Sequence, residues 1–210
     1  NIDAIEAASK PTASSLKPSW EALATATEEN QMQSIMTAFA KTMDKKLNDA
    51  PPGFERNWYY FEGLQAQSEN RLDDALKIYG KLTVKDRYFL PAKYQVAMIH
   101  FEKNNLPQAE LALRAILNED AQSLSPMKDT ELAELNNYAK MGVARIYYQS
   151  ERFKDAIKFY RAIDRNSLLF YDSLFEQSWA FFMAGYPNHA LGALHSVESP
   201  FYKTVFNPEA

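Results

Sequence analysis

Apolar residues recur along most of this chain every three or four positions, which is the spacing of one face of an α-helix. The strict alternation of apolar and polar residues that is typical of β-strands is hard to find. Glycine is scarce, with six residues among 210, while tyrosine and phenylalanine are abundant at spacings that suit helices. The pattern therefore predicts an all-α fold.

A motif that occurs twice indicates how these helices are organised. RLDDALKIYGKL at 71–82 resembles RFKDAIKFYRAI at 152–163, and each stretch contains one alanine that serves as an anchor. A second alanine follows each anchor after 34 residues, whereas the interval between the two halves is 47 residues, one period of 34 with an insertion of 13. The four anchor alanines are Ala75, Ala109, Ala156 and Ala190.

Other positions keep the same register as the anchors. Twelve residues before each anchor stands a small residue: Gly63, Ala97, Ala144 and Ser178. We call a set of equivalent positions in the four units a column. A column that holds small residues while the neighbouring columns hold large ones indicates that two helices cross closely there, so each unit is predicted to be an antiparallel helix pair. The predicted pairs are 55–68 with 71–84, 89–103 with 106–119, 130–149 with 152–165, and 168–184 with 187–198. The insertion is expected to lengthen the first helix of the third pair.

The two ends of the chain differ from this array. Residues 1–18 are small and polar with two prolines, which predicts a flexible linker. Residues 19–50 carry a methionine-rich apolar stripe and predict an N-terminal helical extension, which either covers an open end of the array or binds a partner. The sequence FNPEA begins at 206 with good helix-start residues, so residues 199–210 are expected to start a further, truncated helical unit.

A 34-residue helix–turn–helix unit with these columns resembles the tetratricopeptide repeat (TPR). The resemblance covers an array at 55–198 and implies a right-handed α-solenoid of about four TPR-like units, with the N-terminal helical extension before it. The units would lie near 55–84, 89–119, 130–165 and 168–198. The aromatic that usually begins the first helix is kept only as Tyr59, and no unit closes with the usual proline.

The resemblance also implies that the first helix of each pair lines a concave groove that binds a partner. The matching positions expected to bind are Tyr60, Tyr94, Met98, Met141, Arg145, Tyr148, Phe175 and Trp179. Aromatic rings, and an arginine that can form a fork with a carboxylate, carry much of the energy of protein interfaces. The alternative is that these rings pack between neighbouring helices or against the N-terminal helix.

Composition and motifs argue against several other functions. The net charge of −4 and the scattered basic residues disfavour nucleic-acid binding. The absence of cysteine excludes disulfides and thiolate chemistry, and His100, His189 and His195 lack ligand spacing. No phosphate-binding loop, nucleophile elbow or HExxH motif occurs, so we expect neither cofactor nor catalysis. No apolar run is long enough to span a membrane.

These observations predict a non-catalytic scaffold that binds a peptide or a helix of a partner protein in its groove. Two alternatives are an accessory repeat segment of a larger enzyme and a self-assembling structural component of a bacterial envelope complex. The stretch EQSWAFFMAGYPNHALGALHSVESPFY at 176–202 is similar to bacterial envelope-associated proteins of this repeat class. That similarity implies a periplasmic or envelope location, with the cytoplasm left open, and oligomerisation also stays open.

Overall fold

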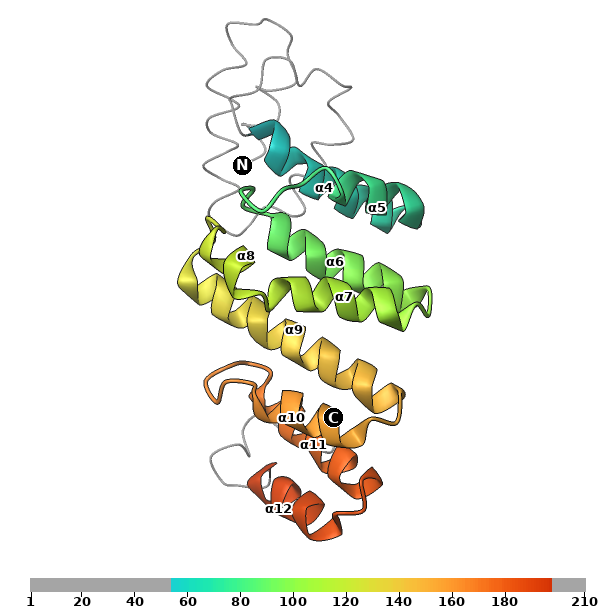
Figure 1. Ribbon diagram of the computed structural model, residues 1–210, viewed down its shortest axis with the longest axis vertical. Helices are drawn as coiled ribbons and strands as arrows, with labels where there is room; N and C mark the ends of the chain where they lie inside the picture. Colours follow the sequence, from blue (N-terminus) through green and yellow to red (C-terminus); the bar gives the residue numbers. More distant parts are fainter. Residues whose placement is uncertain (1–53, 198–210) are drawn as a thin grey trace, which may run out of the picture. The chain divides into compact units, whose positions relative to one another are not determined.

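The computed structural model of the protein describes residues 54–197, and this part of the chain is built of α-helices without a strand (Figure 1). The helices are α4 (Phe54–Ser68), α5 (Leu72–Tyr79), α6 (Phe89–Glu102), α7 (Leu106–Ile116), α8 (Glu119–Ser123), α9 (Asp129–Gln149), α10 (Phe153–Arg161), α11 (Phe170–Met183) and α12 (Pro187–Val197). The all-α prediction is confirmed. The predicted linker at 1–18, the extension at 19–50 and the truncated unit at 199–210 lie outside the described residues.

All eight helices that the sequence predicted between 55 and 198 are present, and α9 is the longest of them with 21 residues. The predicted ends of three second helices were too late, because α5, α7 and α10 end at Tyr79, Ile116 and Arg161. After α5 and α10 the chain forms turns. In these turns the Leu82 amide donates a hydrogen bond to the Tyr79 carbonyl, and the Ile163 amide donates to the Tyr160 carbonyl, each at 3.2 Å. These turns still bury the apolar residue that follows the helix.

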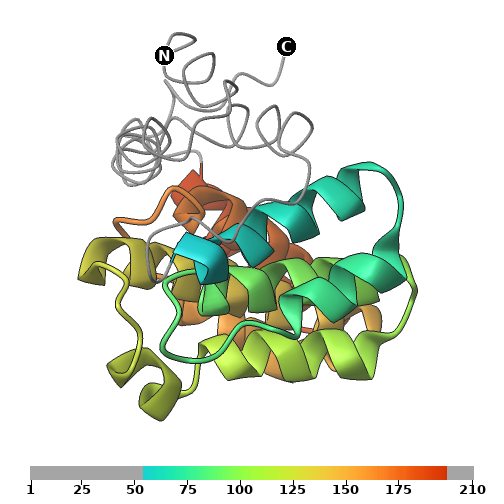
Figure 2. The ribbon, with the colours of Figure 1, turned by 90° about the horizontal axis from the view of Figure 1, so that it is seen from above.

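The short helix α8 was not predicted. It lies in the 13-residue insertion, has no buried residue, and stands apart from the helix pairs (Figure 2). The Asn118 side chain caps it by accepting a hydrogen bond from the Ala121 amide at 2.9 Å. Gln122 donates to the Ile116 carbonyl at 2.8 Å and to Asn136 at 2.9 Å, which ties the insertion to α7 and α9.

The turns inside the four helix pairs share one backbone geometry. Residues with positive φ lie five positions before each anchor alanine: Asn70 at 59°, Asn104 at 55°, Glu151 at 59° and Gly185 at 82°. After α4, the amide of Asn70 donates to the Gln67 carbonyl and the amide of Arg71 to the Ala66 carbonyl, and the other three turns repeat these two bonds. This is the Schellman motif that ends helices. The intervals of 34, 47 and 34 residues therefore recur in the backbone itself.

The columns identified in the sequence are buried. The anchor alanines Ala75, Ala109 and Ala156 are fully buried and Ala190 is 6% exposed. The small residues twelve positions earlier are buried as well, and so is the column seven positions after each anchor, Leu82, Ile116, Ile163 and Val197. Helices approach closely at the small columns because no larger side chain holds them apart.

The chain divides into two compact units, Asn1–Ala92 and Lys93–Ala210, with the boundary inside α6. In the described part of the first unit, α4 packs on α5, and Asp86 in the loop after α5 is almost buried. Asp86 accepts hydrogen bonds from the Thr83 amide at 2.6 Å, the Thr83 hydroxyl at 2.7 Å and Arg56 Nη1 at 3.0 Å. Burial acts to raise the pKa of Asp86, but these bonds hold it below its usual value.

In the second unit, α9 packs against both α7 and α10, α10 packs against α11, and α11 against α12 (Figure 1). One apolar cluster joins α7, α9, α10 and α11, with Leu113 and Ile116 from α7, Met141 from α9 and Ile157 from α10 among its buried members. A polar cluster also links α7 to α9, because Glu110 accepts a hydrogen bond from the Tyr147 hydroxyl at 2.6 Å. This packing holds α9, α10 and α11 in the positions that form the candidate site.

Candidate functional site

A pocket of about 420 Å³ lies among α9, α10 and α11 in the second unit. Its volume is in the range of small-ligand and side-chain binding pockets, roughly 300–1,000 Å³. Among the residues that the structure describes, its lining consists of Arg145, Tyr148, Tyr160, Glu176 and Trp179. Three aromatic rings thus surround one arginine and one glutamate, a combination that suits binding of an amphipathic group.

The polar centre of the pocket is a fork between Arg145 on α9 and Glu176 on α11. Arg145 Nη2 lies 2.6 Å from Glu176 Oε1, and Arg145 Nε lies 2.9 Å from Glu176 Oε2. The sequence predicted that Arg145 would offer such a fork to a partner's carboxylate. In the structure, the edge of the guanidinium formed by Nε and Nη2 is occupied by Glu176.

Tyr160 on α10 completes this arrangement. Its hydroxyl donates a hydrogen bond to Glu176 Oε2 at 3.0 Å, so the carboxylate accepts bonds from two helices. Burial, followed by the nearby Glu176 charge, raises the pKa of Tyr160 above its usual value, which keeps the hydroxyl protonated. The hydrogen bond to Glu176 raises the pKa of Arg145, although partial burial opposes it. The arginine therefore stays charged at every physiological pH.

Arg145 also borders a second, smaller cavity of about 120 Å³. The other lining residues are Tyr94, Met98, Phe101, Ala109, Leu113, Tyr138, Met141, Gly142 and Leu169. This cavity is mainly apolar and closed on one side by the core residues Leu113 and Met141. Arg145 thus lines two cavities of different size, and both have aromatic residues in their lining.

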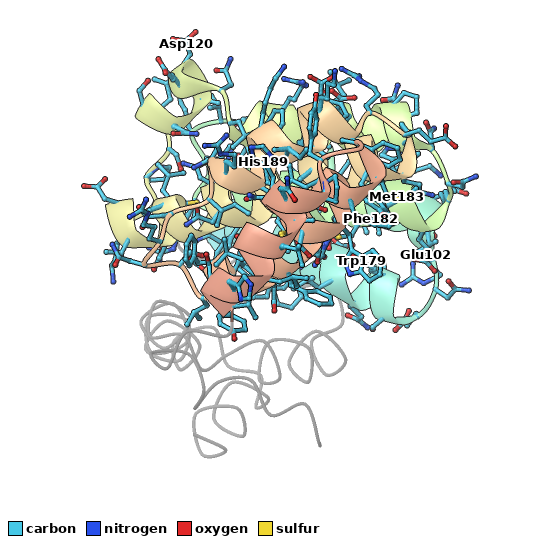
Figure 3. All side chains as sticks on the ribbon, turned by 90° about the horizontal axis from the view of Figure 1, so that it is seen from below. Glu102, Asp120, Trp179, Phe182, Met183 and His189 are labelled. Carbon is cyan, nitrogen blue, oxygen red and sulfur yellow. The ribbon has the colours of Figure 1, made fainter. Side chains whose placement is uncertain are left out.

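A row of exposed apolar side chains runs along α11 beside the larger pocket. Phe175, Trp179, Phe182 and Met183 are 41%, 49%, 59% and 51% exposed, and the spacing of four and three residues places Phe175, Trp179 and Phe182 along one side of the helix. Figure 3 shows Trp179, Phe182 and Met183 close to one another and His189 away from them. The rings of Trp179 and Phe182 meet edge to face, with centroids 6.4 Å apart. We call Phe175, Trp179, Phe182 and Met183 the α11 stripe.

Six of the eight residues that the sequence predicted to bind a partner line these two cavities. Tyr94, Met98, Met141 and Arg145 line the smaller one, and Arg145 lines the larger one together with Tyr148 and Trp179. Phe175 lies on the α11 stripe outside both cavities. Met141 is only 2% exposed and also belongs to the core, so it forms part of the cavity floor.

Tyr60 is not part of this site. It belongs to the other compact unit, where its ring stacks on Tyr88 with centroids 4.8 Å apart and an angle of 6° between the planes. It also meets Phe61 edge to face at 5.4 Å and lies 6.2 Å from Tyr79. The ring of Tyr60 therefore packs against other aromatic rings of this unit.

Glu176, Tyr138 and Tyr160 also line these cavities, and they are not among the residues predicted from the sequence. The period could have identified the first two. Glu176 lies 31 residues after Arg145, and Tyr138 lies 44 residues after Tyr94, which it meets edge to face at 5.9 Å. Each separation is three residues less than the local repeat interval of 34 or 47. A residue on the first helix of one pair therefore contacts the first helix of the next pair about one helical turn before the residue at the equivalent repeat position. Tyr160 lies on the second helix α10, whereas the resemblance places the groove on the first helix of each pair.

The histidines do not form a metal site with other side chains in the part of the chain that the structure describes. That part contains no group of three or more His, Asp or Glu side chains that could hold a metal ion. His189 stacks on Phe181, with ring centroids 5.3 Å apart, and burial lowers the pKa of His100. Between residues 54 and 197, no helix has the length and hydropathy needed to cross a membrane.

Comparison with known proteins reveals a fold relationship. The sequence matches no protein-family model, and no curated protein matches it either. Among solved structures, the chain is similar to BtubC (BKLC) from P. vanneervenii, with a TM-score of 0.58 and 12% sequence identity. The match covers 94% of this chain and 82% of that chain. At this identity the likeness shows a similar fold alone.

Proposed function

We propose that this chain is a non-catalytic scaffold of the tetratricopeptide-like class, a right-handed α-solenoid of about four helix pairs that binds a segment of a partner protein. The observation that carries the proposal is the pocket of about 420 Å³ on the first helices α9 and α11, continued by the exposed α11 stripe. The recurring Schellman turns and the buried small columns support the repeat architecture.

The chemistry of this surface suits a protein segment. Trp179 contributes a large ring that is about half exposed, beside a pocket that also contains an arginine and two tyrosines. Tryptophan, tyrosine and arginine are the residues most enriched among those that dominate binding energy at interfaces. Exposed apolar side chains that form a contiguous patch, rather than single scattered ones, mark interaction sites.

The proposal can be tested by selecting short random peptides, displayed on phage, against the chain 1–210. We expect enriched peptides whose affinity, measured by fluorescence polarisation, falls at least about tenfold in the Trp179→Ala variant. Leu111→Ala is the matched control, since Leu111 is a 63% exposed apolar residue on the second helix α7. It should leave the affinity unchanged, and circular dichroism should show equal helicity in all three proteins.

Equal losses in the two variants, or no enriched peptide, would contradict the proposal. Sedimentation of the free protein over a range of concentrations separates peptide binding from self-association through the α11 stripe. A mass that rises with concentration, and stops rising in Trp179→Ala, would show that the stripe joins copies of the chain instead.

A further inference from the structure

We infer that the partner segment carries an aspartate or glutamate side chain that binds the free edge of Arg145, with an apolar side chain on each side of it. This inference rests on the proposed function and adds the chemical class of the ligand. It follows from three features of the site: the unused donors of Arg145, the fixed position of its guanidinium, and the two cavities beside it.

Arg145 has donors left over after pairing with Glu176. A guanidinium carries five N–H groups. Glu176 engages the side edge formed by Nε and Nη2, while Nη1 makes no hydrogen bond with any residue in the described part of the chain. The end edge formed by Nη1 and Nη2 therefore still has donors, and its geometry matches the two oxygens of a carboxylate. The side chain is 51% exposed, so a ligand can reach it.

Glu176 and Tyr160 act as positioning residues for this edge. The carboxylate of Glu176 accepts three hydrogen bonds from the guanidinium, and the Tyr160 hydroxyl donates to its Oε2 at 3.0 Å. An arginine side chain that is already oriented loses less conformational entropy when it binds a ligand. The hydrogen bond from Tyr160 also draws charge away from Glu176, which weakens its repulsion of an incoming carboxylate.

Other occupants fit the centre of the site less well. A lysine or arginine of the partner would bring a positive charge against Arg145, which is itself charged. An apolar side chain placed over the free edge would cover Nη1 without offering an acceptor, and burying an unpaired donor of a charged group is costly. A carboxylate avoids both penalties.

The two cavities that Arg145 lines offer room for apolar side chains of the same segment. Arg145 lines both, with Tyr148 and Trp179 around the larger cavity and Tyr94 and Met98 around the smaller one. In an extended peptide, side chains on the same face occupy alternate positions. The expected pattern is therefore an acidic residue with apolar residues two positions before and after it, the bulkier one in the larger cavity.

The test uses the peptides enriched on the chain 1–210, synthesised with acetylated and amidated ends so that only side chains carry charge. Each peptide is compared with its Glu→Gln or Asp→Asn form on the wild-type protein and on Arg145→Gln. We expect the peptide change to weaken wild-type binding at least about tenfold, as for a hydrogen bond to a charged group. In Arg145→Gln the two peptides should bind equally, and Arg161→Gln, an exposed arginine on α10, should behave as the wild type.

The outcomes separate the two proposals. Enriched peptides that lack a shared acidic residue, or whose acid can be neutralised without loss of affinity, would overturn the carboxylate site while Trp179→Ala still supports the scaffold. A shared lysine or arginine would overturn it too. Failure to enrich any peptide would remove both proposals. The peptide substitution needs no protein variant, so the result does not depend on the folding of Arg145→Gln.

Discussion

Gly63 on α4 faces the phenol ring of Tyr79 on α5, and a methyl group at position 63 would overlap Cδ1, Cε1 and Cζ of that ring. The ring has little room to move, because Tyr79 is 3% exposed and its hydroxyl donates a hydrogen bond to Gln67 Oε1 at 3.2 Å. We therefore expect Gly63→Ala to lower the free energy of unfolding by about 1–3 kcal/mol through overpacking, measured by urea denaturation.

Gly192 on α12 is the matched control, because a methyl group there would meet no atom within 4 Å. Alanine is a better helix former than glycine by roughly 1 kcal/mol, so Gly192→Ala should leave stability unchanged or raise it. A shift of the same sign and size in both variants would mean that the contact with Tyr79 does not explain the glycine at 63.

The anchor column makes a second prediction on α5. Ala75 is fully buried, whereas the Lys77 side chain two residues later is 78% exposed. Ala75→Leu should cost about 1–3 kcal/mol because the added carbons have no space at the helix crossing. Lys77→Leu should change stability much less. Both can be measured by urea denaturation, and equal costs would show that the repeat register is misplaced.

Glu151 offers a stabilising substitution. It has a φ of 59° in the turn between α9 and α10, where the other three turns carry asparagine or glycine. A side chain with a Cβ is strained in this left-handed region by roughly 1–2 kcal/mol, and glycine is not. We expect Glu151→Gly to raise the midpoint of thermal unfolding and Gly185→Ala to lower it. An unchanged midpoint in both variants would contradict this account of the turns.

The buried carboxylate of Asp86 predicts a pH dependence in the first unit. Asp86→Asn should lower the free energy of unfolding at neutral pH by about 1–3 kcal/mol, since asparagine offers Thr83 a weaker acceptor. The folded pKa of Asp86 lies below its usual value. Its stabilising contribution is therefore complete above the unfolded pKa, about 3.9, and is lost as the pH falls through the folded pKa.

Urea denaturation of wild type and Asp86→Asn at a series of pH values checks this sign. The difference between the two proteins should be largest near neutrality and shrink towards low pH. Glu102→Gln is the control, because Glu102 is an exposed acid in the last turn of α6. A difference between wild type and Asp86→Asn that grows in acid would contradict the assigned hydrogen bonds.

Much of the helical arrangement could be predicted because it depends on local interactions that recur. The turn at Asn70 and the turn at Asn104 use the same two backbone bonds, and the residue types that tolerate positive φ mark three of the four turns in the sequence. The ends of α5, α7 and α10 were less predictable. Leu82 and Ile163 stay buried after the helix has already ended, so a continuing apolar period does not require a continuing helix.

The candidate site was only partly predictable. The column that contains Arg145 and Trp179 follows from the repeat period, and both residues line the larger pocket. The fork between Arg145 and Glu176 does not follow from that column. Glu176 lies one helical turn before Trp179, which is the residue of the next unit at the same repeat position as Arg145. The contact of Tyr60 with Tyr88 in the first unit does not follow from the period either, because Tyr88 lies in the loop between two helix pairs.

The sequence by itself determined the existence and order of the eight paired helices, the turns within each pair and the small columns, but not the short helix α8 or the ends of α5, α7 and α10. These features arise from helical periodicity and backbone preference, which neighbouring residues decide. Only the tertiary structure decided which edge of Arg145 is occupied, which rings line cavities and which rings pack inward. Those outcomes depend on side-chain directions across separate helices, where residues such as Tyr160 and Glu176 meet through packing rather than through proximity in the chain.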